Sequence, residues 1–182
     1  MARTDTGNKT KNNIKNICFT GLMAAMITVC TAFIKIPTGI NAGYLHFGDS
    51  MIYISGCFLG PWAFIASALG GAMADILAGS PQWAVATAII KALNALPFVI
   101  VSSVYRKKNG RIRIVNKYTL PVTVLSGLIT VFGYLLAESI MYSFPSAVTS
   151  VPFSIIQAVG SAIIFAVLGK IIDKIDINKY IK

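Results

Sequence analysis

Charged residues are scarce in this chain, since only 12% of its 182 residues are Asp, Glu, Lys or Arg and only six are acidic. Histidine occurs once, and the three cysteines Cys18, Cys30 and Cys57 show neither CxxC spacing nor a neighbouring histidine. They therefore indicate neither a disulfide framework nor a metal site. The chain also lacks the Walker A, HExxH and GxSxG motifs, so it is not expected to hydrolyse ATP or to use a bound cofactor.

Apolar residues, in contrast, make up 55% of the chain, and its mean hydropathy of +0.72 lies outside the range of soluble domains. We therefore interpret the chain as a multi-pass protein of the cell membrane. A spanning helix needs about 20 mostly apolar residues. The length thus predicts an all-α fold with six transmembrane helices, in a single integral membrane domain over residues 1–182.

The positions of the basic residues give the orientation. The net charge is +10, and 14 of the 16 basic residues fall near the N-terminus, in one central loop over 105–118, or near the C-terminus. Basic residues favour the cytoplasmic side, so we predict that both termini and this loop lie in the cytoplasm. Because topology explains the charge, no nucleic-acid partner is expected. The loop is expected to lie in solvent beside anionic membrane lipid, and docking to a partner protein is the alternative.

The apolar runs place the six helices at about 14–34, 49–60, 61–79, 83–105, 118–142 and 151–173. The basic tail over 1–13 is expected to be frayed, and 144–150 is expected to form an external loop. The second run covers only about 18 Å as a helix, less than the roughly 30 Å of hydrocarbon. Part of the preceding polar segment is therefore expected to dip inward and to border a cavity open to the exterior.

Ionisable side chains at membrane depth are costly and point to function by default. Counted from the helix ends, Asp49, Asp75, Lys91 and Glu138 all fall in the outer half of their helices. Their shared depth predicts one externally open polar pocket that binds a small molecule. The other predicted substrate-binding residues are Tyr44, His46, Trp83, Asn94, Tyr134 and Gln157.

Each of these groups also has a purely structural interpretation. Asp75 and Lys91 could form an interhelical ion pair, which would neutralise two expensive charges without any ligand. Asp49 could serve only as the N-cap of its helix. Glu138 has few cations within reach, so it is the stronger candidate for a ligand contact.

A family resemblance rests on three runs of sequence: GYLHFGDSMIYISGCFLGP, GGAMADILAG and PQWAVATAIIKAL. They resemble the substrate-binding S components of energy-coupling factor (ECF) vitamin transporters, especially the riboflavin-type branch, which also holds pyridoxine and hydroxymethylpyrimidine candidates. The resemblance implies six helices with cytoplasmic termini and a vitamin pocket near the outer surface. It also implies partner subunits, namely a transmembrane scaffold and two cytoplasmic ATPases that use the ATP.

Small residues at four-residue spacing in the first helix allow close helix packing. The resemblance implies that this helix docks on the scaffold subunit, for which many relatives carry AxxxA. Here the spacing occurs as Gly21 with Ala25, or as Ala24 with Thr28. Packing within the chain explains the pattern equally well.

The leading hypothesis is a non-enzymatic membrane subunit that binds a water-soluble B-type vitamin or precursor and delivers it inward with ATPase partners. Asp, Lys and Asn in the pocket suit a small pyridine or pyrimidine, while the aromatic residues suit riboflavin. The first alternative is a stand-alone secondary transporter or channel for a small polar solute, although no inverted repeat of broken helices is detectable. The second and more distant alternative is an intramembrane enzyme.

Overall fold

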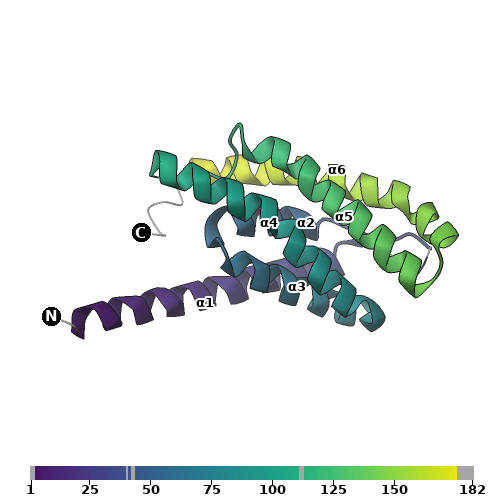
Figure 1. Ribbon diagram of the computed structural model, residues 1–182, viewed down its shortest axis with the longest axis horizontal. Coiled ribbons are helices and arrows are strands. Elements are labelled where there is room, and N and C mark those ends of the chain that lie inside the picture. The colour runs from purple at the N-terminus through teal and green to yellow at the C-terminus, as the bar shows by residue number, and fades with distance from the viewer. Residues whose placement is uncertain (1–2, 40, 42–43, 111–112, 176–182) are drawn as a thin grey trace.

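The computed structural model describes residues 3–39, 41, 44–110 and 113–175. Most side chains of the basic tail predicted over 1–13, as well as Lys179 and Lys182, lie outside the described residues. The fold is all-α apart from one small hairpin and one 3-10 turn (Figure 1). Its elements are α1 (Arg3–Ala32), β1 (Lys35–Pro37), β2 (Tyr44–His46), α2 (Gly48–Leu59), α3 (Trp62–Ala78), η1 (Pro81–Trp83), α4 (Ala84–Asn109), α5 (Thr119–Met141) and α6 (Phe144–Ile175).

Two expectations about helix ends are wrong. The first helix begins at Arg3, so the polar tail continues α1. The segment expected as an external loop over 144–150 is the first part of α6. Pro145 was taken as a loop residue, but it lies in the first turn of α6, where its missing N–H costs no hydrogen bond. The N–H of Ala147 already bonds the carbonyl of Ser143 there.

The short helix α2 lies at the centre of the bundle. Eleven of its twelve residues are buried, and it contacts α1, α3, α4 and α6. The ring of Tyr53 stacks on Phe98 of α4 with centroids 4.6 Å apart, and Phe165 of α6 meets Phe98 at 5.1 Å. These buried rings join three helices into one core.

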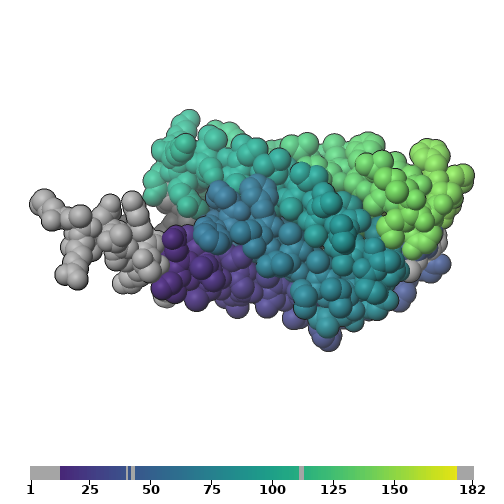
Figure 2. Space-filling view, turned by 60° about the horizontal axis from the view of Figure 1, so that its bottom comes forward, coloured from purple at the N-terminus to yellow at the C-terminus, as the bar shows by residue number. Residues whose placement is uncertain are grey.

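The helix α3 packs between α1 and α4 because most of its buried residues are small, and its larger side chains such as Leu69 and Met73 point outward. A Cβ at Gly70 would lie 2.8 Å from the carbonyl oxygen of Ala24 in α1, and one at Gly71 would lie 2.9 Å from Cγ of Lys91 in α4. Both approaches are closer than real Cβ atoms tolerate, so the two glycines set the helix spacing. Figure 2 shows α1 and α3 running together over one face of the molecule.

Within the described residues, four helical segments are long and apolar enough to cross a membrane: Asn13–Ala32, Pro81–Asn109, Thr119–Met141 and Phe144–Ile175. This confirms the prediction of a multi-pass membrane protein. The other two helices are shorter, since α2 has 12 residues and α3 has 17. The number of spans and the side on which the termini lie stay predictions.

The polar segment between α1 and α2 is non-helical and forms a hairpin, which the sequence did not predict. Strand β1 pairs antiparallel with β2, and Lys35 lies opposite His46. The ammonium of Lys35 donates to the carbonyl of Ala78 at 3.0 Å, which ties the hairpin to the end of α3. The hairpin, η1 and the α5–α6 turn lie at one end of the bundle, while the start of α1 and the end of α6 lie at the other (Figure 1).

Candidate functional site: a polar pocket under the hairpin

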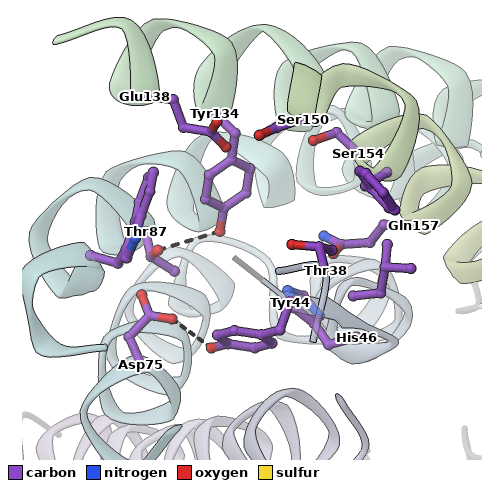
Figure 3. Close-up of a pocket in the computed structure, with 13 residues that line it drawn as sticks. Thr38, Tyr44, His46, Asp75, Thr87, Tyr134, Glu138, Ser150, Ser154 and Gln157 are labelled. Atoms are coloured by element: carbon purple, nitrogen blue, oxygen red, sulfur yellow. Dashed lines mark hydrogen bonds between the residues drawn. The ribbon is translucent and has the colours of Figure 1, made fainter. Parts of the chain in front are cut away.

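A pocket opens at the hairpin end of the bundle, between the hairpin, the α3–α4 connection, α5 and α6 (Figure 3). Its walls are polar although the surrounding helices are apolar. Such a cavity inside an apolar bundle is the usual place for a ligand site. The lining residues are Thr38, Tyr44, Leu45, His46, Asp75, Trp83, Thr87, Tyr134, Glu138, Ser150, Phe153, Ser154 and Gln157.

Seven of the ten substrate-binding candidates line this pocket, so the sequence pattern did identify one site. They are Tyr44, His46, Asp75, Trp83, Tyr134, Glu138 and Gln157. The remaining three, Asp49, Lys91 and Asn94, do not line it and are fully buried. Asn94 instead joins α4 to α5, because its side-chain amide donates to Thr130 Oγ1 at 3.1 Å and its backbone carbonyl accepts from Ser126 Oγ at 2.9 Å.

A buried ion pair links α2 to α4. The ammonium of Lys91 lies 2.6 Å from Oδ1 of Asp49, and both side chains are at most 1% exposed. The other carboxylate oxygen of Asp49 accepts from Nε2 of Gln157 at 3.1 Å. The N-cap interpretation of Asp49 is therefore wrong, since its helix has no side-chain cap and the carboxylate serves Lys91. Gln157 connects this pair to the pocket wall.

The backbone that follows β2 holds the ring of His46 in one orientation. The N–H of Gly48 donates to Nδ1 at 3.1 Å, so the proton of the neutral ring sits on Nε2, 3.5 Å from the ammonium of Lys91. Both groups are donors, so this approach adds no hydrogen bond. The ring is buried beside the ammonium of Lys91, a place that disfavours a second positive charge, so we interpret it as neutral.

Asp75 contacts the hairpin and not Lys91. Its Oδ1 accepts from the phenol of Tyr44 at 2.6 Å, as drawn in Figure 3. The proposed Asp75–Lys91 ion pair is therefore wrong, because Lys91 turns toward α2. The Oδ2 atom of Asp75 is buried and has no hydrogen-bond partner among the described residues. This oxygen is shielded from the pocket space, and the side chain of Thr87 lines the pocket beside Asp75.

Glu138 lies on another wall of the pocket, on α5 (Figure 3). Its Oε2 accepts from Nδ2 of Asn41 at 2.6 Å, and only 6% of the residue is exposed. Asn41 has a φ of 51°, a conformation that Asn adopts more readily than other non-glycine residues. Its side chain also accepts from Ser146 Oγ at 2.6 Å, so Asn41 ties the hairpin tip to α5 and α6.

Aromatic rings form the remaining side of the pocket. Trp83 lies with its ring centroid 5.9 Å from that of Tyr134 and 6.1 Å from that of Tyr142. The phenol of Tyr134 is 3.3 Å from the hydroxyl of Thr87. The indole Nε1 of Trp83 is buried without an acceptor in the part of the chain that the structure describes. The rings offer flat surfaces, and the indole offers one donor.

Several pocket residues were missed by the sequence reasoning. Thr38, Thr87, Ser150, Phe153 and Ser154 are neutral, so no cost of burying charge drew attention to them. On α6, however, Ser150, Ser154 and Gln157 follow helical spacing on one face. That stripe was a usable signal, but its first member was assigned to a loop.

Comparison with known proteins identifies the family. Residues 11–174 match the family described as "ECF-type riboflavin transporter, S component". The chain belongs to this family. The S-component resemblance drawn from the hairpin and the two following helices is thereby confirmed. The family is one of transporter components and not of enzymes.

Two relatives of this S component are also similar along much of their sequence. An "Uncharacterized protein in gap 3'region" of Pyrococcus woesei is 36% identical over 149 residues, which cover 81% of this chain and 95% of the relative. A "UPF0397 protein" of Lactiplantibacillus plantarum is 30% identical over 105 residues, which cover 57% of this chain and 55% of that protein.

The two small-residue pairs of α1 lie in different places in this S component. Thr28 donates to the carbonyl of Gly70 at 3.1 Å, and Ala24 lies against the same glycine, so this pair packs on α3. Gly21 and Ala25 are exposed, and a Cβ at Gly21 would meet nothing within 4 Å. The second pair is therefore open to contact from outside the chain.

Proposed function

We propose that this chain is the substrate-specificity subunit of an ECF importer and binds a water-soluble B-type vitamin or precursor in the pocket under the hairpin. The observation that carries the proposal is a pocket lined largely by polar side chains at the hairpin end of an apolar bundle, in a member of an S-component family. Pyridoxine, hydroxymethylpyrimidine and riboflavin are the substrate classes to be tested. The bound molecule is then delivered inward.

The proposed topology has six spanning helices with both termini in the cytoplasm. The described basic residues support it. Arg106 and Lys108 are in the last turn of α4 and Lys174 is in the last turn of α6, and these two helix ends lie at the end of the bundle opposite the hairpin (Figure 1). The positive-inside rule then directs the pocket outward. In this arrangement the short helix α2 and the hairpin together fill one crossing.

The proposed partners are a transmembrane scaffold subunit and two cytoplasmic ATPases, which supply the ATP hydrolysis that this chain has no motif for. Gly21 and Ala25 on the open face of α1 are the proposed contact with the scaffold. Small residues let two helices approach closely in lipid, where packing drives association. Ala24 and Thr28 are not proposed for this contact, because they already pack on α3.

Ligand binding by the purified chain tests the proposal. The protein is purified in detergent, any molecule carried through purification is identified by mass spectrometry, and the binding of that molecule and of the three named vitamins is measured by calorimetry. Ser154→Leu, which adds bulk to the pocket wall, is expected to abolish binding. Thr149→Leu is the matched control, because Thr149 is exposed on the same helix. Failure of the unmodified chain to bind any of these molecules would overturn the proposal.

Uptake into liposomes separates the proposal from a stand-alone secondary transporter. An S component is expected to take up substrate only when the scaffold and ATPases are present with ATP. Uptake by this chain alone, driven by a proton or sodium gradient, would favour the carrier instead.

A further inference from the structure

A hollow lined by basic side chains lies at the end of the bundle opposite the hairpin, between the last turn of α4 and the segment that leads into α5 (Figure 1). Its volume is about 510 Å³, within the range of about 300–1,000 Å³ that ligand sites usually have. Lys108, Arg113 and Lys117 line it, and its described lining residues include no carboxylate. None of them belongs to the pocket under the hairpin. The hollow is therefore a separate candidate for binding an anion.

The three cations have no counter-ion among the described residues, where the ion pair joins Lys91 to Asp49. Asp173 contacts the same segment, but its carboxylate is engaged by the backbone. Its Oδ1 accepts from the N–H of Ile114 at 2.7 Å, and its Oδ2 accepts from the N–H of Val115 at 2.9 Å. Even when this carboxylate is counted, three positive charges against one negative charge leave an excess of two. An anion in the hollow balances that excess.

The helix ends do not account for all of these charges. Lys108 lies in the last turn of α4, where the helix dipole favours a cation. Lys117 is in the opposite situation, because it precedes Tyr118, the N-cap of α5, and the N-terminus of a helix favours an anion. The preference of basic residues for the cytoplasmic side explains their number but not their convergence on one hollow. A bound anion explains both the convergence and the position of Lys117.

Hydrogen bonds fix the wall of the hollow between α4 and α5. Oδ1 of Asn116 accepts from the N–H groups of Tyr118 and Thr119 at 2.8 and 3.1 Å. Oγ1 of Thr119 donates to the carbonyl of Ile114 at 2.8 Å, and the carboxylate of Asp173 holds the same segment against α6. A wall that is already ordered loses little conformational freedom when a ligand binds. The backbone that carries two of the cations is thus in place before any ligand arrives.

The hollow lies at the depth of lipid headgroups. From Ala84, the start of α4, to Tyr105 the helix covers about 32 Å, close to the roughly 30 Å of hydrocarbon. The ring centroid of Tyr118 is 6.4 Å from that of Tyr105, and tyrosines are common at this border. Lys108 lies about one turn further along α4. The cations are therefore just beyond the hydrocarbon, at the level of the phospholipid phosphates.

We propose that this hollow binds the headgroup of one anionic phospholipid, with the phosphodiester among Lys108, Arg113 and Lys117. The planar guanidinium of the arginine donates two parallel hydrogen bonds to one phosphate, and basic hollows between helices at this level suit such headgroups. Exposed apolar side chains of α5, among them Leu120 and Val124, follow Tyr118 into the hydrocarbon and contact the acyl chains. That contact favours a lipid over free phosphate. The inference does not depend on the proposed vitamin site.

Two lipids with identical acyl chains test the proposal on the unmodified protein. Dioleoyl phosphatidylglycerol carries a net negative charge, and dioleoyl phosphatidylcholine carries none. Each is titrated into the detergent-purified protein, and the bound lipid is counted by native mass spectrometry. We expect one phosphatidylglycerol molecule to bind about 100-fold more tightly than phosphatidylcholine, since each of the three basic residues contributes about fivefold. Binding of the two lipids within about threefold of each other would overturn the proposal.

Two triple variants that remove the same charge from the same end of the bundle locate the site. The first neutralises the cations of the hollow, by Lys108→Gln, Arg113→Gln and Lys117→Gln. The second neutralises exposed lysines that do not line the hollow, by Lys107→Gln, Lys170→Gln and Lys174→Gln. The first is expected to abolish the preference for phosphatidylglycerol, and the second is expected to change it by less than about threefold. Equal losses in both would indicate general attraction to the surface and overturn the proposal.

Melting temperatures check that the variants fold. If the first triple variant does not fold, Arg113→Gln alone is measured. It is expected to weaken the binding of phosphatidylglycerol about fivefold, and an unchanged affinity would contradict the proposed site.

Inorganic phosphate separates a lipid site from a site for a soluble anion. It lacks acyl chains, so it is expected to leave bound phosphatidylglycerol in place when added in about tenfold excess. Displacement of the lipid would assign the hollow to a soluble anion and overturn the proposal. So would a first triple variant that binds the lipid as before but no longer co-purifies with the scaffold subunit or the ATPases, because the hollow is then a partner contact. None of these results bears on vitamin binding, so the proposed function stands or falls separately.

Discussion

The buried ion pair between Asp49 and Lys91 is predicted to stabilise the fold only as a pair. Lys91→Met removes the ammonium but keeps most of the side-chain volume. It leaves the carboxylate of Asp49 buried, with the amide of Gln157 as the donor that remains to it among the described residues. Breaking a buried pair in this way costs about 3–5 kcal/mol. For a domain of this size each kcal/mol lowers the melting temperature by about 2–4 °C. The variant is therefore expected to melt about 6–20 °C lower.

The double variant separates an interaction from two independent effects. Asp49→Asn alone leaves the Lys91 ammonium buried without its counter-charge. It is expected to lower the melting temperature by a similar amount. Asp49→Asn combined with Lys91→Met buries no net charge, and it is expected to melt above either single variant. Tryptophan fluorescence of the detergent-purified protein follows the melting. Lys170→Met, an exposed lysine on α6, serves as the control and is expected to change little. If the double variant loses the sum of the two single losses, the pair is not coupled as described.

Three further predictions follow from the packing. Gly70→Ala is expected to cost about 1–3 kcal/mol, because its Cβ would press on the backbone of Ala24, whereas Gly21→Ala meets no atom and should leave the melting temperature unchanged. Gly21→Leu is expected to keep ligand binding but to lose co-purification with the scaffold subunit; unchanged co-purification would exclude this face of α1. The single histidine, His46, should show one set of ¹⁵N imidazole signals, those of the neutral Nε2–H tautomer, unchanged between pH 8 and pH 5. A signal that titrates near pH 6.5 would contradict the buried, neutral ring.

The sequence was sufficient to predict the membrane class, the non-helical segment before α2 and most of the pocket. These features depend on properties that are local in sequence, such as apolar runs, Gly and Pro content and distance from a helix end. The depth of these side chains in the membrane could therefore be predicted from the sequence. That prediction grouped Tyr44, Asp75, Tyr134 and Glu138 in one pocket.

The ion-pair partner of each charged side chain could not be predicted from the sequence. Asp49 and Asp75 lie at comparable depth, and choosing which one meets Lys91 requires the rotation of α2, α3 and α4 about their axes. That rotation is set by packing, in particular by Gly71 of α3, against which the stem of Lys91 lies. The sequence likewise gave no sign that Asn41 reaches Glu138, because hairpin geometry decides that contact.

The start of α6 differs from the prediction for another reason, whereas α5 ends at Met141, close to the predicted 142. The predicted loop over 144–150 contains Pro145, and Pro152 follows it, but both prolines lie within α6. A proline can lie in a loop or in the first turn of a helix. Only the arrangement of the neighbouring backbone shows which of the two applies.

The enclosure of α2 by other helices has a consequence for how lipids act on this protein. A helix that meets protein on all sides does not sense acyl chains, so changes in bilayer thickness or lipid saturation should act on the outer helices and reach α2 only through them. The surroundings of α2 resemble the core of a soluble domain. This explains how the helix accommodates a carboxylate and several serine hydroxyls. Hydropathy profiles alone will therefore undercount the helices of such proteins.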